Sequence, residues 1–217
     1  CRDGKLVVNN STISSNSTIL HGGGIAAYNA MVEVNSSTIA GNIGGIDMGM
    51  GGGVTNFDGT MTLKNSIVAD NYGNWFGMDC WGDISSAGYN LIGNSSGCNF
   101  IASSGDQVDV DPLLTPLEGQ PAFQRLQPGS PAISAATPSG CLDHQGQLLT
   151  TDQRGMPRAG RCDIGAYEAL LTVKAQAEES IHSNRMVTYT LTIDNDDRSA
   201  HLDGVRLTDT FASKLIY

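Results

Sequence analysis

Val32-Glu-Val-Asn-Ser-Ser-Thr-Ile-Ala-Gly-Asn42 is the middle one of three similar segments that decide the fold. The others are Leu6-Val-Val-Asn-Asn-Ser-Thr-Ile-Ser-Ser-Asn16, 26 residues earlier, and Met61-Thr-Leu-Lys-Asn-Ser-Ile-Val-Ala-Asp-Asn71, 29 residues later. A glycine-rich block, Gly22-Gly-Gly-Ile25, also recurs 29 residues later as Gly51-Gly-Gly-Val54. A fixed period of this length, with β-type residues and Gly-rich corners, indicates stacked coils.

Apolar residues alternate at the start of each segment, which places them on one face of a strand. The alternation breaks at Asn10, Ser36 and Asn65, where we expect a sharp bend into a second short strand. The inward residues of that second strand are Ile13, Ile39 and Val68, which we expect to form one interior ladder.

A further corner follows at Asn16, Asn42 and Asn71. Asn tolerates left-handed backbone and bonds locally. Parallel strands lie about 4.8 Å apart, so the three amides can stack as a ladder. The triple-Gly corners suit coils that pass closely or adopt positive φ. We therefore predict an all-β chain that folds as a right-handed parallel β-helix, with a fourth coil starting at Tyr89-Asn-Leu-Ile-Gly93.

Six of the seven prolines fall within residues 106–140, which excludes a helix or a central strand through much of that stretch. An open β-helix end exposes unpaired strand edges, so an irregular cover is expected there. The sequence predicts a final coil and an irregular cap, and a first domain that spans residues 1–168.

Composition narrows the functional classes. The net charge is −10 and no basic stripe is present, which argues against nucleic acid and against anionic membrane surfaces. No apolar run reaches the ~20 residues of a membrane span. The chain begins at Cys1, as mature lipoproteins also do, and we interpret it as a fragment of a longer secreted protein.

Five cysteines are present, and none forms a Cys-x-x-Cys pair, so zinc is not expected. The spacing favours disulfides between Cys80 and Cys98 and between Cys141 and Cys162; the alternative is buried thiols. Each bond would close a loop of about 20 residues, worth roughly 3 kcal/mol. We expect both loops to lie outside the apolar ladders, so that reduction loosens the cap more than the repeats.

The second half carries a family resemblance. Its motifs include Gly88-Tyr-Asn-Leu-Ile-Gly93, Asp111-Pro-Leu-Leu114, Thr151-Asp-Gln-Arg-Gly155 and Cys162-Asp-Ile-Gly-Ala-Tyr-Glu168. Together with Cys80 and Cys98, they resemble the bacterial surface β-helix proteins of the choice-of-anchor domain, Q type, near the polymorphic outer-membrane repeat proteins. The resemblance covers roughly residues 5–168, with a departure at Ile133-Ser-Ala-Ala136, and it implies a secreted, surface-anchored protein without established catalytic residues.

Residues 169–217 lack the β-helix repeat pattern and have the sequence pattern of antiparallel strands. Val187-Thr-Tyr-Thr-Leu-Thr-Ile193 alternates as a half-exposed antiparallel strand does, and Val205-Arg-Leu-Thr-Asp-Thr-Phe211 is a second strand region. The pattern resembles the immunoglobulin-like repeat of bacterial surface proteins. Such a sandwich needs about 100 residues, so we expect a partial domain here.

Candidate chemical groups are sparse. The four histidines lack metal-ligand spacing. Asp152, Arg154, Asp163 and Glu168 could be catalytic, but we expect them to tie the cap together through ion pairs. Two groups of acids could bind calcium weakly, although neither matches a calcium loop and solvated turns are favoured. These groups are Asp106, Asp109 and Asp111, and Asp194, Asp196 and Asp197.

Parallel β-helices also include pectin-degrading enzymes, which need clustered carboxylates. Asp47, Asp58 and Asp70 do not fall at one equivalent position, and Asp79 and Asp83 are the best remaining acidic pair. We therefore predict no catalytic, cofactor or metal site. The expected function is an extracellular structural or adhesive module of a bacterial surface that assembles head-to-tail with its own copies into a filament or layer, and that contacts surface glycans. The alternative is a carbohydrate-binding or pectin-lyase-like, polysaccharide-degrading β-helix.

Overall fold

The computed structural model describes residues 1–45, 49–74, 77–158, 160–169, 171–177 and 189–195. The chain divides into two compact units, Cys1–Glu168 and Ala169–Tyr217, which is where the sequence places the boundary. Every regular element in the described ranges is a β-strand, so the all-β prediction is confirmed. Nothing in the described part of the chain forms a helix with the length and apolar character that crossing a membrane requires.

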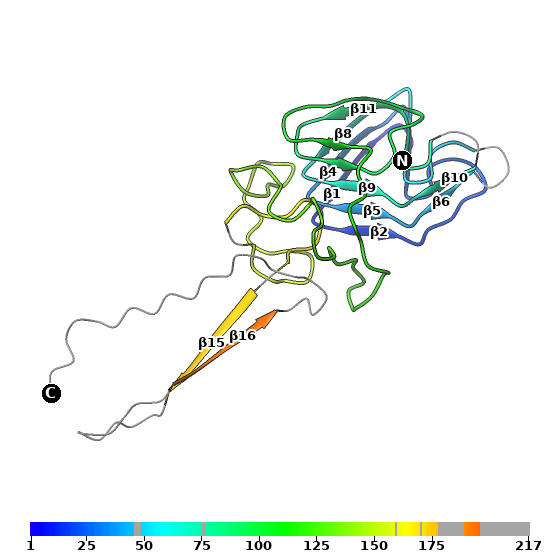
Figure 1. Cartoon of the computed structure of the whole chain (residues 1–217). Helices are drawn as coiled ribbons and strands as arrows, with labels where there is room; N and C mark the ends of the chain where they lie inside the picture. The colour runs from blue at the N-terminus through cyan, green and yellow to red at the C-terminus, as the bar shows by residue number, and fades with distance from the viewer. Residues whose placement is uncertain (46–48, 75–76, 159, 170, 178–188, 196–217) are drawn as a thin grey trace, which may run out of the picture. The chain divides into compact units, whose positions relative to one another are not determined.

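The strands of the first unit pair in parallel and stack coil upon coil as a β-solenoid (Figure 1). One sheet, called here the β1 sheet, is built from the first strand of each coil. It contains β1 (Lys5–Asn9), β4 (Met31–Asn35), β8 (Thr60–Lys64), β11 (Cys80–Ser86) and β13 (Cys98–Ile101).

A second sheet, the β2 sheet, follows the bend of each coil. It contains β2 (Thr12–Ser14), β5 (Thr38–Ala40), β9 (Ile67–Ala69), β12 (Leu91–Ile92) and β14 (Gln107–Val108). The pairing of β12 with β9 confirms that the Tyr89–Gly93 segment belongs to a further coil, but the first strand of that coil is β11, so the coil starts before the predicted Tyr89.

The remaining strands complete the coils. They are β3 (Ile25–Tyr28) and β7 (Val54–Phe57), which pair with each other, and β6 (Ile43–Gly44) and β10 (Tyr72–Gly73). The strand β11 joins two sheets, because its first residues pair with β7 and its last with β8. The joint is Gly82, with φ of 85°, where an added Cβ would lie 2.3 Å from the carbonyl oxygen of Asn56.

The register of the coils follows the sequence repeat. Ile13 pairs with Ile39, and Ile39 pairs with Val68, so the predicted interior ladder is confirmed. Ile39 and Val68 are fully buried, and Ile13 packs against the same core while remaining partly exposed. The alternating pairs of the β1 sheet align in the same way: Leu6 with Val32 and Met61, and Val8 with Val34 and Leu63.

Both predicted corners are present, and each contains residues with positive φ. At the first corner, Asn10, Ser36 and Asn65 have φ of 49°, 46° and 48°, as a sharp bend requires. At the second corner, the left-handed residues are those preceding each Asn, namely Ser15, Gly41 and Asp70. The sharp turn thus precedes Asn16, Asn42 and Asn71, whose side chains bond locally at the corner.

The triple-Gly corners confirm the expected close passage of coils. An added Cβ on Gly24 would lie 2.8 Å from the carbonyl oxygen of Gly53, and one on Gly53 would lie 2.5 Å from that of Asp79. Only a residue without a side chain fits where successive coils approach this closely.

Residues 109–168, called here the cap segment, contain turns and isolated antiparallel bridges such as Leu114 with Leu126 and Leu142 with Leu148. The segment is irregular, as the prolines predict. It lies along the first corner of successive coils (Figure 1), where it bonds Asn10, Thr38 and Asn65, and it also accepts a hydrogen bond from Gln107 of β14, the last strand of the β2 sheet. Polar groups at that corner point outward and give the segment regularly spaced partners.

The second unit contains one described pair of antiparallel strands, β15 (Leu171–Ala177) and β16 (Tyr189–Asn195). The strand β16 confirms the antiparallel strand expected near residues 187–193. The strand region expected at 205–211 and the calcium group at 194–197 lie wholly or partly outside the described residues.

Candidate functional site

The predicted amide ladder is present and runs in one direction. Asn16 Nδ2 donates to Asn42 Oδ1 at 3.0 Å, and Asn42 Nδ2 donates to Asn71 Oδ1 at 2.9 Å. Asn71 Nδ2 then donates to Asp79 Oδ1 at 2.9 Å. Asp79, which the sequence offered only as one of an acidic pair, is therefore the terminal acceptor of the ladder.

A second polar column also ends on an aspartate. Backbone N–H groups donate to the side chain of the next coil: Ser37 to Ser66 Oγ at 3.2 Å, Ser66 to Asn90 Oδ1 at 3.0 Å, and Asn90 to Asp106 Oδ1 at 2.7 Å. Asp106 Oδ2 accepts from Ser86 Oγ and from the backbone of Ser103, both at 2.6 Å. Its oxygens are thus engaged within the fold, which argues against a calcium-binding role.

The two acids Asp79 and Asp83 do not form a site together. Asp79 points inward and is 2% exposed, whereas Asp83 lines a different depression and accepts a hydrogen bond from Asn99 Nδ2 at 3.0 Å. Gly82 bends the strand between them, so two acids close in sequence face different environments.

A pocket of about 440 Å³ instead brings Asp79 together with Asp70, Asp109 and Asp111. Burial raises the pKa of Asp79 to about 6, although hydrogen bonds from Asn71 and from the backbone of Asn94 oppose the shift. Burial and the charge of Asp111 also raise the pKa of Asp70. A buried carboxyl group with a raised pKa in a pocket is a candidate general acid.

The pocket is not arranged as a metal centre. In the described ranges, no group of three or more His, Cys, Asp or Glu side chains converges as metal ligands do. Asp109 Oδ1 accepts from the backbone of Ser95, and Asp111 Oδ1 from that of Leu113, both at 2.8 Å. These two acids therefore cap turns, as the sequence analysis favoured.

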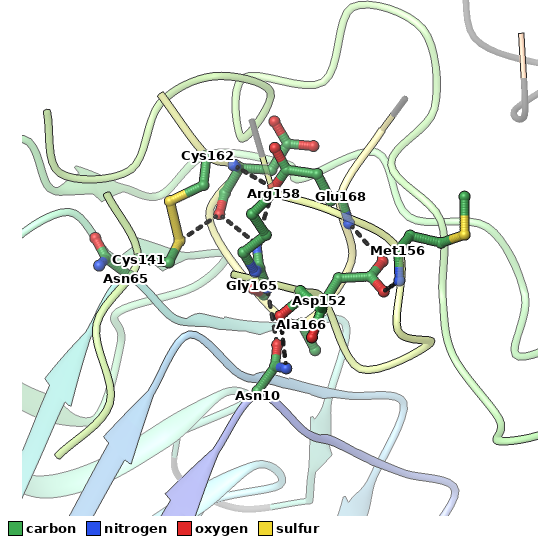
Figure 2. A network of polar contacts seen from close by, with 12 residues as sticks. Asn10, Asn65, Cys141, Asp152, Met156, Arg158, Cys162, Gly165, Ala166 and Glu168 are labelled. Atoms are coloured by element: carbon green, nitrogen blue, oxygen red, sulfur yellow. Dashed lines mark hydrogen bonds and ion pairs between the residues drawn. A yellow bond between two sulfur atoms is a disulfide. The ribbon is translucent and has the colours of Figure 1, made fainter. Parts of the chain in front are cut away.

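Two of the four predicted cap residues, Asp163 and Glu168, contact a second arginine, Arg158, that the sequence analysis missed, and Figure 2 shows Arg158 beside Glu168. Arg154 pairs with Asp152 Oδ2 at 2.8 Å, which confirms one expected ion pair. Glu168 pairs with Arg158 at 2.9 Å, and both side chains are almost fully buried. Asp163 joins through its backbone N–H, which donates to Glu168 Oε2 at 3.0 Å.

Arg158 also ties the cap segment to the solenoid (Figure 2). Its Nη2 donates to Asn10 Oδ1 and to the Gly165 carbonyl oxygen, both at 2.9 Å. Asn10 Nδ2 in turn donates to the Thr151 carbonyl oxygen at 3.0 Å, and Thr12 Oγ1 donates to Gln153 Oε1. The sequence signal for this role was the presence of two arginines, four residues apart, among three acids.

Burial and, to a smaller extent, the charge of Asp163 raise the pKa of Glu168 to about 7, although Arg158 opposes the shift. The cap therefore holds a carboxyl group that changes charge near neutral pH. Because Glu168 and Arg158 are buried within the fold and bond each other, they act as a structural joint between the cap segment and the coils.

Both predicted disulfides are present, between Cys80 and Cys98 and between Cys141 and Cys162. The second lies in the cap segment. The first joins β11 to β13, and Cys80 belongs to the solenoid core, so the expectation that both loops lie outside the ladders is wrong for this bond. Two disulfides are typical of an oxidising compartment.

Aromatic rings cover the outer face of the β3–β7 pair. The rings of Tyr28 and Phe57 stack at 4.8 Å, Trp81 lies 4.8 Å from Phe57, and the edge of His21 contacts Phe57 at 4.9 Å. Tyr28 and Phe57 stack face to face, whereas His21 and Trp81 meet Phe57 at larger angles, and such ring contacts stabilise the sheet.

Comparisons with protein-family models, curated proteins and solved structures find no match for this chain. The resemblance to the choice-of-anchor proteins therefore stays a prediction, and the geometry alone supports the functional argument.

Proposed function

We propose that this chain is an extracellular structural or adhesive module of a bacterial surface. The observation that carries the proposal is how the buried polar groups are used. Asn42, Asn71 and Asn90 bond successive coils to one another, and Arg158 and Glu168 bond the cap segment to the coils. Such an arrangement suits a module that must keep its shape.

The proposal also covers the handedness of the coil, the protein family and the cellular location of the chain. It includes a right-handed coil, membership in the choice-of-anchor group of surface β-helix proteins, and an immunoglobulin-like fold for residues 169–217. The two disulfides support an extracellular location, because such bonds form and persist in oxidising environments.

Assembly into a filament or surface layer is part of the proposal. The strands β1 and β2 pair on one side only in the described part of the chain, with β4 and β5, and the strands β13 and β14 pair only with β11 and β12. Free strand edges favour head-to-tail contact between copies, which generates open assemblies.

Electron microscopy of the oxidised chain tests this proposal, with light scattering across a concentration series as the second measurement. We expect filaments or ordered layers that grow with concentration. A stable, monodisperse monomer at every concentration would contradict assembly.

A polysaccharide-cleaving enzyme is the second candidate, and the pocket around Asp79 is the observation that favours it. We place it second because Asp79 Oδ1 already accepts two hydrogen bonds from Asn71. Release of new sugar ends from polygalacturonate, abolished in Asp79→Asn and retained in Asp83→Asn, would reverse that order.

A further inference from the structure

A polar cleft of about 480 Å³ lies between the outer face of the β1 sheet and residues 143–146 of the cap segment. Its floor is formed by Glu33 and Asn35 of β4 and by Thr62 and Lys64 of β8. Because β4 and β8 pair in parallel, Glu33 aligns with Thr62, and Asn35 aligns with Lys64. The floor therefore presents polar side chains in two rows, at the ~4.8 Å spacing of neighbouring strands.

The wall of the cleft is held in place before any ligand arrives. Asn9 Oδ1 accepts from the backbone of His144 at 3.1 Å, and Asn9 Nδ2 lies 3.0 Å from His144 Nδ1. Asp143 Oδ1 accepts from the backbones of Gln145 and Gln147, both at 2.8 Å. A preorganised wall lowers the ordering cost of binding.

Several polar groups in the cleft have hydrogen-bonding capacity left over. Among the described residues, neither the Lys64 ammonium nor the Thr62 hydroxyl has a partner. Lys5 pairs with Glu33 Oε1 at 2.8 Å, and Oε2 of the same carboxylate remains for a ligand. Donors and acceptors thus face the same space.

The charges at the cleft balance, because Lys5 and Lys64 offset Glu33 and Asp143. A polyanion would meet two carboxylates, and a polycation would meet two ammonium groups. A ligand that offers both donors and acceptors without net charge fits best. We propose that this cleft binds a neutral, hydroxyl-rich oligosaccharide.

The proposal deepens the adhesive part of the proposed function and rests on it, but does not depend on filament assembly. Among the described residues that line the cleft, His144 carries the one aromatic ring and no Phe, Tyr or Trp is present, so each site binds mainly through hydrogen bonds and is weak. Many copies displayed on one surface compensate through avidity.

The test is saturation-transfer NMR on the intact chain with neutral cello-, xylo-, manno- and malto-oligosaccharides at millimolar concentration, with oligogalacturonate as the charged comparison. Thr62→Val removes one hydroxyl, and Lys64→Met removes the ammonium. Thr60→Val is the matched control, because Thr60 lies two residues away on the same strand, exposed and outside the cleft.

We expect binding of at least one neutral oligosaccharide, about fivefold weaker in Thr62→Val and in Lys64→Met and unchanged in Thr60→Val. No binding of any neutral oligosaccharide, or binding only of oligogalacturonate, would overturn the ligand class. Oligosaccharide binding with the same affinity in Thr62→Val and in Lys64→Met as in the parent chain would show that the ligand does not bind in this cleft. If filaments form but no oligosaccharide binds, the oligosaccharide site is wrong while the proposed assembly stands.

Discussion

The coils of the solenoid repeat each contact, whereas the cap segment makes each of its contacts once. Ile39 packs between Ile13 and Val68, and the same arrangement recurs along the ladder. Arg158, by contrast, joins Glu168 and Asn10 through one side chain, a contact that does not recur from coil to coil among the described residues. The comparison teaches that the coils depend on shared packing, and that the cap segment depends on a few buried charges.

The largest expected effect lies in the coils. Ile39→Ala removes a fully buried side chain from the middle of the ladder and leaves a cavity, so we expect a loss of about 4 kcal/mol in the free energy of unfolding. Urea denaturation measures the loss. Ile19→Ala is the control, because Ile19 is 59% exposed and its truncation should change stability by less than about 0.5 kcal/mol. Equal effects of the two variants would contradict the interior ladder.

The next largest expected effect comes from Arg158→Met, which should destabilise the cap segment but not the coils. Arg158→Met leaves the buried Glu168 carboxylate without its arginine, a change that costs about 3 kcal/mol in comparable buried pairs. We expect the cap segment to become sensitive to limited proteolysis while the coils stay resistant. Arg161→Met is the control, since Arg161 is exposed and donates only to backbone carbonyl groups. A chain that loses protection throughout would show that the coils depend on the cap segment.

The two disulfides sharpen the comparison, because one lies in each region. Replacing Cys141 and Cys162 together by Ala should cost roughly 3 kcal/mol and loosen the cap segment. Replacing Cys80 and Cys98 should cost a similar amount, but at the fourth coil. Proteolytic fragments mapped by mass spectrometry distinguish the outcomes, and cleavage at the same sites in both double variants would contradict this division.

The smallest effect is a pH dependence. The pKa of Glu168 is raised to about 7 and that of Asp79 to about 6, mainly by burial. The folded chain therefore binds more protons than the unfolded chain between the ordinary carboxyl pKa and these values. Its stability should rise by on the order of 1–2 kcal/mol per group as pH falls from about 8 to about 5.

Urea titrations at several pH values measure this dependence. Glu168→Gln should flatten the part of the curve near pH 7, and Asp79→Asn the part between about pH 4 and pH 6. Stability that falls steadily from pH 8 to pH 5 in the parent chain would have the wrong sign.

The coils could be predicted from the sequence because their physics is local and repeated. Apolar alternation, the phase break at Asn65 and the return of Asn71 fix the register of a coil without knowledge of distant contacts. The side chain of Asn42 could likewise be assigned to a ladder, because identical residues stack when the strands are in register.

The cap segment and the pocket could not be predicted in the same way, because their contacts occur once and join distant residues. Asp79 ends the amide ladder from a position outside the repeated segments, so no offset pointed to it. Arg158 reaches Asn10 across 148 residues of sequence. The contacts of the cap segment with Thr38 and Asn65 could not be predicted for the same reason, since they join residues far apart in the sequence.

Native-state hydrogen exchange on the intact, oxidised chain tests the central claim most directly, because it reports each region separately. The account predicts the slowest exchange in β5 and β9, and faster exchange in the cap segment. It also predicts that Arg158→Met accelerates exchange in the cap segment alone. Exchange of the coils and the cap segment at one common rate, in both the parent chain and Arg158→Met, would contradict the account.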